Sequence, residues 1–194
     1  MEQYGDEAFI YVMAHRSTKS QSYEIQNDIN NGYIVIRDKT INFSKREIVK
    51  DKLYMTLPSN FKIMLPRAAR FKYPGKNRPH LILTDESGSI NIHFTFTKDQ
   101  LKDEDTELAR DCIAQAITTA NPERSIISSS VIWEETHVAY FDFICPVSNG
   151  EVYNLVFTFS LDEQLVLGNF NCLHFDKARW QDISIQMLRT IRKR

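Results

Sequence analysis

Four apolar segments separated by very short polar turns occupy residues 125–173, and this spacing constrains the fold more than any other feature. Each segment has the β-branched and aromatic composition of a strand. The separators are residues 134–135, 148–150 and 162–163, which are too short for a crossover connection. Strands joined in this way run antiparallel and lie side by side. The predicted strands are 125–133, 136–145, 153–160 and 164–173.

Helical periodicity flanks this strand region on both sides. Residues 103–120 and 176–192 carry apolar residues three or four positions apart, which is the spacing of one helix face. Asp103 or Asp105 is expected to cap the first helix, and Asp176 the second. The predicted stripes are Leu108, Cys112, Ile113, Ala116, Ile117 and Ala120 in the first helix, and Trp180, Ile183, Met187, Leu188 and Ile191 in the second.

The chain between residues 52 and 103 predicts shorter elements. Residues 53–57 form an apolar strand that Pro58 ends, and residues 61–70 suit a short helix. Two further strands are predicted at 81–84 and 89–96, around a polar turn.

The first 44 residues form a separate unit in this interpretation. Asn30-Asn31-Gly32 has the composition of a tight reversal, so we predict a hairpin of residues 23–29 with residues 33–36. The chain then divides into an extension that contains the hairpin, residues 1–44, and an α+β domain, residues 45–194.

The combination of strands and helices defines the fold class. A meander of antiparallel strands with a helix before and after it predicts an α+β protein, because helices cover the apolar sheet face. We expect an antiparallel sheet of about five to seven strands, covered by the helices in an α/β/α sandwich.

The order of elements after residue 52 resembles a known family. An apolar strand closed by Leu57-Pro58-Ser59-Asn60-Phe61 is similar to the opening strand of PsbP-like proteins. A Tyr73-Pro74 turn, a strand pair, a long helix, the meander and a final helix with Trp180 follow in the order of the PsbP-like sandwich. The resemblance covers residues 45–192 and leaves the first 44 residues outside.

The PsbP-like superfamily includes a photosystem extrinsic subunit, the Ran-binding Mog proteins, the bacterial DcrB proteins and chaperones for secreted bacterial effectors. The resemblance implies a bacterial-type module that binds a protein or a ligand and performs no chemistry. It carries over no individual binding residue.

Composition and cysteine content bear on the compartment. No apolar run reaches the ~20 residues of a membrane-spanning helix, so we expect no membrane insertion. The early apolar run, residues 8–14, follows acidic residues rather than the basic residues of a signal peptide. Cys112, Cys145 and Cys172 are too few for a disulfide scaffold, which predicts reduced thiols and a cytoplasmic protein.

No motif in the sequence fixes a reaction. Cys172 and His174 would share a strand face, but zinc needs three or four ligands and no further pair has metal-binding spacing. A nucleophile elbow and a phosphate-binding loop are both absent from the sequence. Asp142 is interpreted as a half-exposed strand carboxylate rather than an acid or base. We therefore expect a protein that is not an enzyme and has no catalytic residue, metal or cofactor.

Charge is unevenly distributed, although the whole chain carries a net charge of only −1. Residues 52–84 contain seven Lys and Arg and no carboxylate, whereas residues 85–175 contain 15 carboxylates and four cations. Residues 67–78 interleave aromatic rings with cations in a loop, and loops often carry function. The candidate residues for binding a partner or an anion are Arg70, Lys72, Tyr73, Lys76 and Arg78.

Two interpretations of this basic loop stay open. Either it attracts an acidic protein face, a phosphorylated ligand or nucleic acid, or its cations pair with carboxylates of the same molecule. A sequence pI near 6.5 argues against nonspecific nucleic-acid binding. We expect a non-enzymatic protein-interaction module, with an adaptor or chaperone for an exported bacterial protein as its specific version. The alternative is a small-molecule or anionic-ligand binding protein, or a hydrolase, with a pocket between sheet and helix.

Overall fold

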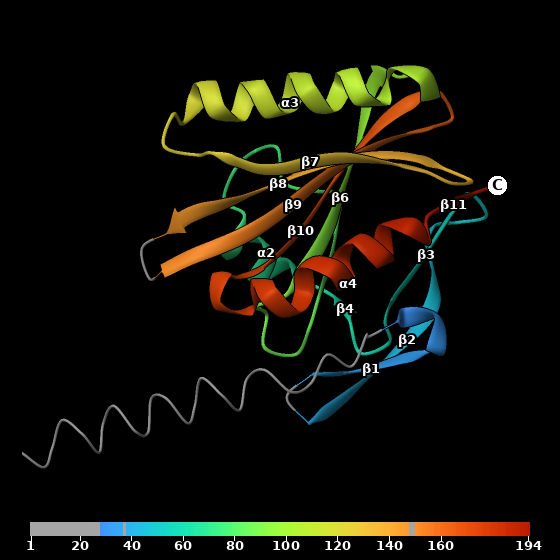
Figure 1. Ribbon diagram of the computed structural model, residues 1–194, viewed down its shortest axis with the longest axis vertical. Coiled ribbons are helices and arrows are strands. Elements are labelled where there is room, and N and C mark those ends of the chain that lie inside the picture. The colour runs from blue at the N-terminus through green and yellow to red at the C-terminus, as the bar shows by residue number, and fades with distance from the viewer. Residues whose placement is uncertain (1–27, 37, 148–149) are drawn as a thin grey trace, which may run out of the picture.

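The computed structural model describes residues 28–36, 38–147 and 150–194 (Figure 1). Its strands form two antiparallel sheets, in the orders β1-β2-β3-β11 and β4-β5-β6-β10-β9-β8-β7. The strands are β1 (Tyr33–Ile36), β2 (Lys39–Val49), β3 (Leu53–Pro58), β4 (Lys62–Ile63), β5 (Leu81–Thr84), β6 (Asn91–Gln100), β7 (Ile126–Trp133), β8 (His137–Val147), β9 (Gly150–Leu161), β10 (Gln164–Leu173) and β11 (Arg192–Lys193). The α-helices are α2 (Pro66–Lys72), α3 (Thr106–Ala120) and α4 (Lys177–Arg189), and the 3-10 helices are η1 (Ile29–Asn31), η2 (Asp103–Asp105) and η3 (His174–Asp176).

The predicted meander is confirmed. β7, β8, β9 and β10 pair in chain order, and β6 continues the sheet beside β10. The β9–β10 turn consists of Asp162 and Glu163, which both have positive φ, 51° and 59°. Two consecutive residues of positive φ give the tight turn whose twist matches that of paired strands. The turn thereby sets Leu161 opposite Gln164.

The seven-stranded sheet is covered on both faces (Figure 1). α3 lies over one face, on β7, β8 and β9, and α4 lies over the other beside the four-stranded sheet. The burial predicted for this stripe is confirmed, because four apolar residues of α4 and Ile191, two residues beyond its end, are each at most 3% exposed. They belong to the main core together with Phe94, Phe157 and Phe170 of the sheet. The molecule is therefore the predicted α+β sandwich, with a sheet inside the predicted range of strand number.

A glycine in β10 makes room for an aromatic ring in this core. Gly168 and Phe157 are direct partners across β9 and β10. A Cβ atom on Gly168 would lie 2.0 Å from Cζ of Phe157, well inside van der Waals contact. The ring therefore crosses above the glycine, where it meets Phe94 edge-on at 5.8 Å between ring centroids. This position requires glycine because of the close approach rather than its φ angle.

The predicted apolar stripe of α3 is partly wrong. Ile113 and Ile117 pack on the sheet as predicted, but Leu108, Cys112, Ala116 and Ala120 are exposed. The helix is rotated because two polar residues take places on its covered face.

These two residues, Thr106 and Arg110, are both buried and bonded. Thr106 Oγ1 donates to the Asp103 carbonyl oxygen, and Arg110 Nη1 donates to the Ser130 carbonyl oxygen on β7. Apolar periodicity does not register such polar anchors, which explains the rotation. The expected caps are also wrong in detail, since neither Asp105 nor Asp176 makes a capping hydrogen bond from its side chain.

The hairpin near the start of the described chain lies one strand later than predicted. β1 pairs with β2, so that Ile36 lies opposite Lys39, and Asp38 takes positive φ, 61°, at the reversal. Gly32 instead ends the 3-10 helix η1 with φ of 79°. Residues 23–27 of the predicted first strand lie outside the described residues. β2 continues across the proposed boundary at residue 44, and the division into two units stays a prediction.

The segment predicted as a helix over 61–70 is a two-residue strand, β4, followed by α2. Pro66 begins α2 because its fixed φ suits the first helical position and its missing N–H is not needed there. No helix within the described residues has both the length and the apolar character required to cross a membrane.

Candidate functional site

The five predicted binding residues all lie in α2 and the loop that follows it. Arg70 and Lys72 occupy the last turn of α2, and Tyr73 ends the helix. Lys76 and Arg78 follow in the loop that leads to β5. Arg70 and Lys76 are exposed and form no hydrogen bond or ion pair with any other described residue.

The other three residues hold the loop in place. Arg78 Nε donates to the carbonyl oxygen of Tyr73 at 2.8 Å, which closes the loop on itself. Lys72 Nζ donates to the carbonyl oxygen of Gly88 at 2.7 Å, in the turn before β6. The predicted set therefore separates into two cations without a partner among the described residues and three residues that fix the loop.

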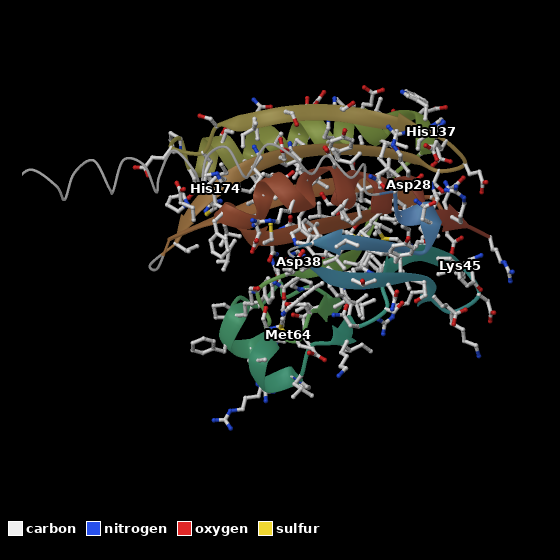
Figure 2. All side chains as sticks on the ribbon, turned by 60° about the horizontal axis from the view of Figure 1, so that its bottom comes forward. Asp28, Asp38, Lys45, Met64, His137 and His174 are labelled. Carbon is white, nitrogen blue, oxygen red and sulfur yellow. The ribbon has the colours of Figure 1, made fainter. Side chains whose placement is uncertain are left out.

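α2 is attached to the sheet by a small apolar cluster. Ala69 packs with Met64 and Ile82, and Tyr73 completes the cluster. Seven residues with such a small covered face leave most of the helix surface in water. In Figure 2 the segment around the labelled Met64 projects from the body of the molecule, with side chains pointing outward.

The outward side of this segment exposes three large apolar side chains. Phe71 is 91% exposed, Leu65 74% and Ile63 65%. Single exposed apolar residues are ordinary, but three within nine residues, interleaved with cations, are typical of an interaction surface. We call the whole set the basic–apolar surface: Lys62, Ile63, Leu65, Arg67, Arg70, Phe71 and Lys76.

The cations of this surface have no internal partners in the described chain. Lys52 forms an ion pair with Asp162. No other Lys or Arg of residues 52–84 has a described carboxylate within 4.0 Å. Some acidic residues pair instead with the end of the chain, where Arg192 lies 2.8 Å from Glu135 and Lys193 lies 2.7 Å from Asp103. Internal ion pairs therefore neutralise the C-terminal cations and leave the basic–apolar surface positive.

The inward side of the loop meets polar residues on the sheet. Asn or His occupies five paired positions on one face of three neighbouring strands, and His93 and Asn171 among them contact Tyr73 at the end of α2. Sequence reasoning missed them, although the alternation with Ile92 and Phe94 on β6 predicts a polar face on that strand. We call them the polar strip: Asn91 and His93 on β6, Asn154 on β9, and Asn169 and Asn171 on β10.

Hydrogen bonds link the polar strip to the loop. Asn91 Nδ2 donates to Asn171 Oδ1 at 2.9 Å, and Asn169 Nδ2 donates to Asn154 Oδ1 at 3.0 Å. Asn171 Nδ2 donates to the hydroxyl oxygen of Tyr73 at 3.3 Å. The loop is thus anchored on polar contacts as well as on the small apolar cluster.

The polar strip retains buried acceptors. Asn91 Oδ1, His93 Nδ1 and Asn169 Oδ1 are buried and have no hydrogen-bond partner among the described residues. Burial, with the charge of Lys72 nearby, lowers the pKa of His93 to about 4, so His93 is neutral at pH 7. Burial also raises the pKa of Tyr73 and lowers that of Lys72. The strip therefore holds buried polar atoms that no described residue satisfies.

The residues weighed for thiol or metal chemistry do not form a site. Cys172 is fully buried, and burial with the charge of Asp176 raises its thiol pKa to about 12. His174 Nδ1 lies 2.7 Å from Glu151 Oε2. Over the described ranges, His, Cys, Asp and Glu form no group of three or more arranged to hold a metal ion.

Asp142 is fully buried, so the half-exposed position predicted for it is wrong. Its Oδ1 accepts hydrogen bonds from the backbone N and Oγ of Ser128, at 2.8 and 2.7 Å. Its Oδ2 accepts from Tyr153 Oη at 2.9 Å and Gln181 Nε2 at 3.0 Å. The carboxylate ties β7, β9 and α4 to β8. The prediction failed because the donors that satisfy the carboxylate come from three other elements, which only the folded chain brings together.

Comparison with known proteins identifies the fold. No protein-family model and no curated protein matches the sequence. The solved structure of cyanobacterial PsbP (CyanoP) from Synechocystis sp. PCC 6803 aligns with a TM-score of 0.57 and 8% identity, over 82% of this chain and 97% of CyanoP. LpqN, involved in cell envelope biogenesis of Mycobacterium tuberculosis, aligns with a TM-score of 0.50 and 10% identity, over 81% of this chain and 94% of LpqN. This chain has the PsbP-like fold that the order of its elements predicted.

Proposed function

We propose that this protein is a non-enzymatic interaction module that binds an acidic partner protein through the basic–apolar surface. The observation that carries the proposal is the 91% exposure of Phe71 on a helix whose neighbouring cations have no ion-pair partner in the described chain. An adaptor or chaperone for an exported protein is the specific form of this function. We also propose a cytoplasmic location, which is consistent with three free thiols.

The physical basis of binding differs between the two components of the surface. Cations such as Arg67 and Arg70 steer an acidic partner and raise its association rate, an effect that salt screens. Phe71, Leu65 and Ile63 would supply most of the affinity, because burying a large apolar side chain is worth about 1.5 to 3 kcal/mol. Aromatic residues at the centre of an interface commonly dominate its energy.

The experiment compares partner recovery by matched variants of the full chain. Phe71→Ser removes the apolar anchor, and Leu108→Ser removes a 63% exposed apolar side chain from α3 as a control. Each variant is used to capture proteins from the native cell, and recovery is measured by quantitative mass spectrometry. We expect Phe71→Ser to lose the partner that the wild type and Leu108→Ser both recover. Equal recovery by the two variants would overturn the proposal.

A second assay, with lipid vesicles, distinguishes binding to a protein partner from binding to a lipid surface. The same variants are mixed with vesicles of phosphatidylserine and phosphatidylcholine and sedimented. Binding of the wild type that Phe71→Ser abolishes, with no protein partner recovered, would assign the basic–apolar surface to anionic lipid instead.

A second candidate function is favoured by the polar strip. Its two buried amide oxygens and one imidazole nitrogen without a partner suit a small ligand that carries hydroxyl or N–H groups. The test is a screen of polar small molecules by thermal shift, with Asn169→Ala as the comparison. A stabilisation that Asn169→Ala abolishes and Phe71→Ser preserves would favour this function over protein binding.

A further inference from the structure

β7 is the longest outer strand of the two sheets in the described chain. It has eight residues, whereas the strands at the other three ends, β1, β4 and β11, have four, two and two. An outer strand presents unpaired backbone N–H and C=O groups to a second chain. Proteins limit such pairing with short strands, charges, prolines or a covering element. Three of the four ends meet this condition by being short.

β7 itself has little protection against pairing. None of its residues is charged, and none is Pro or Gly. A bulge near Ile127 interrupts the pairing with β8 only at the start of the strand. Two large apolar side chains near the ends are exposed, Ile127 by 46% and Trp133 by 61%. The strand reads Ile126-Ile127-Ser128-Ser129-Ser130-Val131-Ile132-Trp133.

α3 leaves this edge open. The helix packs mainly over β8 and β9, and β7 lies at the border of the sheet beside it (Figure 1). Arg110 of α3 donates to the carbonyl oxygen of Ser130 at 3.1 Å, and a carbonyl oxygen can accept a second bond. The Ser130 carbonyl can therefore take a second donor while the helix stays in place, whereas the N–H of Ser128 is already donated to Asp142 Oδ1.

We propose that β7 pairs antiparallel with β7 of a second copy of this chain, across a two-fold axis at Ser129. The sequence selects this occupant, because the strand has nearly the same composition in both directions from that residue. Ser128 would lie opposite Ser130 of the other copy, and Ile127 opposite Val131. A two-fold interface has to be self-complementary, whereas a peptide from another protein has no such requirement.

The same register covers the exposed ends of the strand. Trp133 of one copy lies diagonally across from Ile127 of the other, within reach of a large aromatic side chain. No charged side chains oppose each other along the strand itself. The shared edge is only ~26 Å long, so we expect a dimer of micromolar strength that depends on concentration.

The residues beyond the strand ends neither favour nor oppose this pairing. Arg124 of one copy comes opposite Glu134 of the other, which is attractive. Glu123 comes opposite Glu135, which is repulsive and of similar size. The strand between them therefore decides the association, and Ser129 on its axis is the place to test it.

The test uses sedimentation velocity over a concentration series with the full chain. Ser129→Lys and Ser129→Glu each place two like charges against each other at the axis, about 5 Å apart. We expect the wild type to dimerise as its concentration rises, and each variant to raise the dissociation constant about tenfold or more. Mixing the two variants places Lys opposite Glu and should restore the dimer.

Controls separate this pairing from a folding defect and from a general effect of charge. Thr119→Lys adds the same charge at an exposed position of α3 and should leave the dimer intact. Circular dichroism checks that each Ser129 variant is folded, and amide hydrogen exchange should show protection of β7 that grows with wild-type concentration. A wild type that stays monomeric throughout, or a dimer that Ser129→Lys leaves unchanged, would overturn the proposal. Failure of the mixed variants to associate would overturn the axis at Ser129. The inference does not depend on the basic–apolar surface.

Discussion

α4 and α2 each carry a large aromatic residue, yet the two helices use it in opposite ways. Trp180 of α4 is 3% exposed and packs against Phe170, with 5.7 Å between ring centroids. Phe71 of α2 is 91% exposed and contacts no aromatic neighbour among the described residues. The first residue stabilises the fold, and the second is free to stabilise a complex.

The cations of the two helices differ in the same way. Arg189 at the end of α4 lies 2.9 Å from Glu134, and Lys193 just beyond lies 2.7 Å from Asp103. Arg67 and Arg70 of α2 have no carboxylate of the described chain within 4.0 Å. Paired charges contribute to local order, whereas the unpaired charges of α2 extend their field into solvent.

The largest expected effect is on the free energy of unfolding, when each of the two aromatic residues is replaced separately by alanine. Trp180→Ala removes a buried ring and should lower the free energy of unfolding by about 3 to 5 kcal/mol. Phe71→Ala removes an exposed ring and should change it by less than about 0.5 kcal/mol. Urea denaturation measures both. A Trp180→Ala midpoint equal to that of the wild type would show that α4 does not hold the sheet.

The second effect concerns the tight packing under α4. Gly168→Ala would place a Cβ atom 2.0 Å from the Phe157 ring, so we expect a loss of stability of up to about 3 kcal/mol. Gly75→Ala in the basic loop is the matched control, because the nearest atom to its Cβ would be 4.0 Å away. Thermal unfolding should shift strongly for the first variant only. Similar shifts for both would contradict the packing described here.

The third effect tests the polar face of the sheet beneath α2. The pKa of His93 is lowered from 6.5 to about 4, so the unfolded chain binds more protons than the folded chain between these values. Stability from this group is therefore complete above about pH 6.5 and falls as the pH drops toward 4. At pH 4.5 the loss should be about 2 kcal/mol.

The control for this pH dependence is His93→Gln, which removes the titrating group. Denaturation of wild type and variant at pH 7 and pH 4.5 isolates the contribution of His93. If the two proteins lose the same stability between these pH values, His93 is not buried in its neutral form.

The sequence predicted the positions that apolar burial decides better than the positions that polar contacts decide. The stripe of α4 and the meander follow from apolar periodicity alone, because only apolar burial decides those positions. The stripe of α3 was misplaced, since Thr106 and Arg110 reach backbone oxygens that no periodicity reveals. Asp142 was misjudged for the same reason, because its four donors come from three different elements.

For the candidate site, the sequence indicated the positive charge of the segment but not the exposure or the contacts of its residues. The basic composition of residues 52–84 pointed to the segment of the proposed site, but not to which of its residues face water. Phe71 is exposed because α2 is short and only Ala69 reaches the sheet from its interior. The roles of Arg78 and Lys72 depend on carbonyl oxygens in the loop and in the turn before β6, which only the folded chain brings together.

The smallest expected effect on stability is also the most informative about function. Arg70→Glu combined with Lys76→Glu reverses two exposed cations that have no partner in the described chain, so the free energy of unfolding should change by less than about 0.5 kcal/mol. Arg78→Glu breaks the bond to the Tyr73 carbonyl and should cost about 1 kcal/mol, which makes it the structural control. Internal ion pairing would instead require the double reversal to cost up to about 1 kcal/mol.

Partner binding then separates the two interpretations of the loop. If the cations steer an acidic partner, the double reversal should slow association and flatten its dependence on salt, while the dissociation rate changes little. Surface plasmon resonance with the partner recovered by the wild type, at several salt concentrations, measures both rates. Unchanged association by a folded double variant would leave Phe71 and its apolar neighbours as the sole basis of binding, and the charge of residues 52–84 as a property of solubility alone.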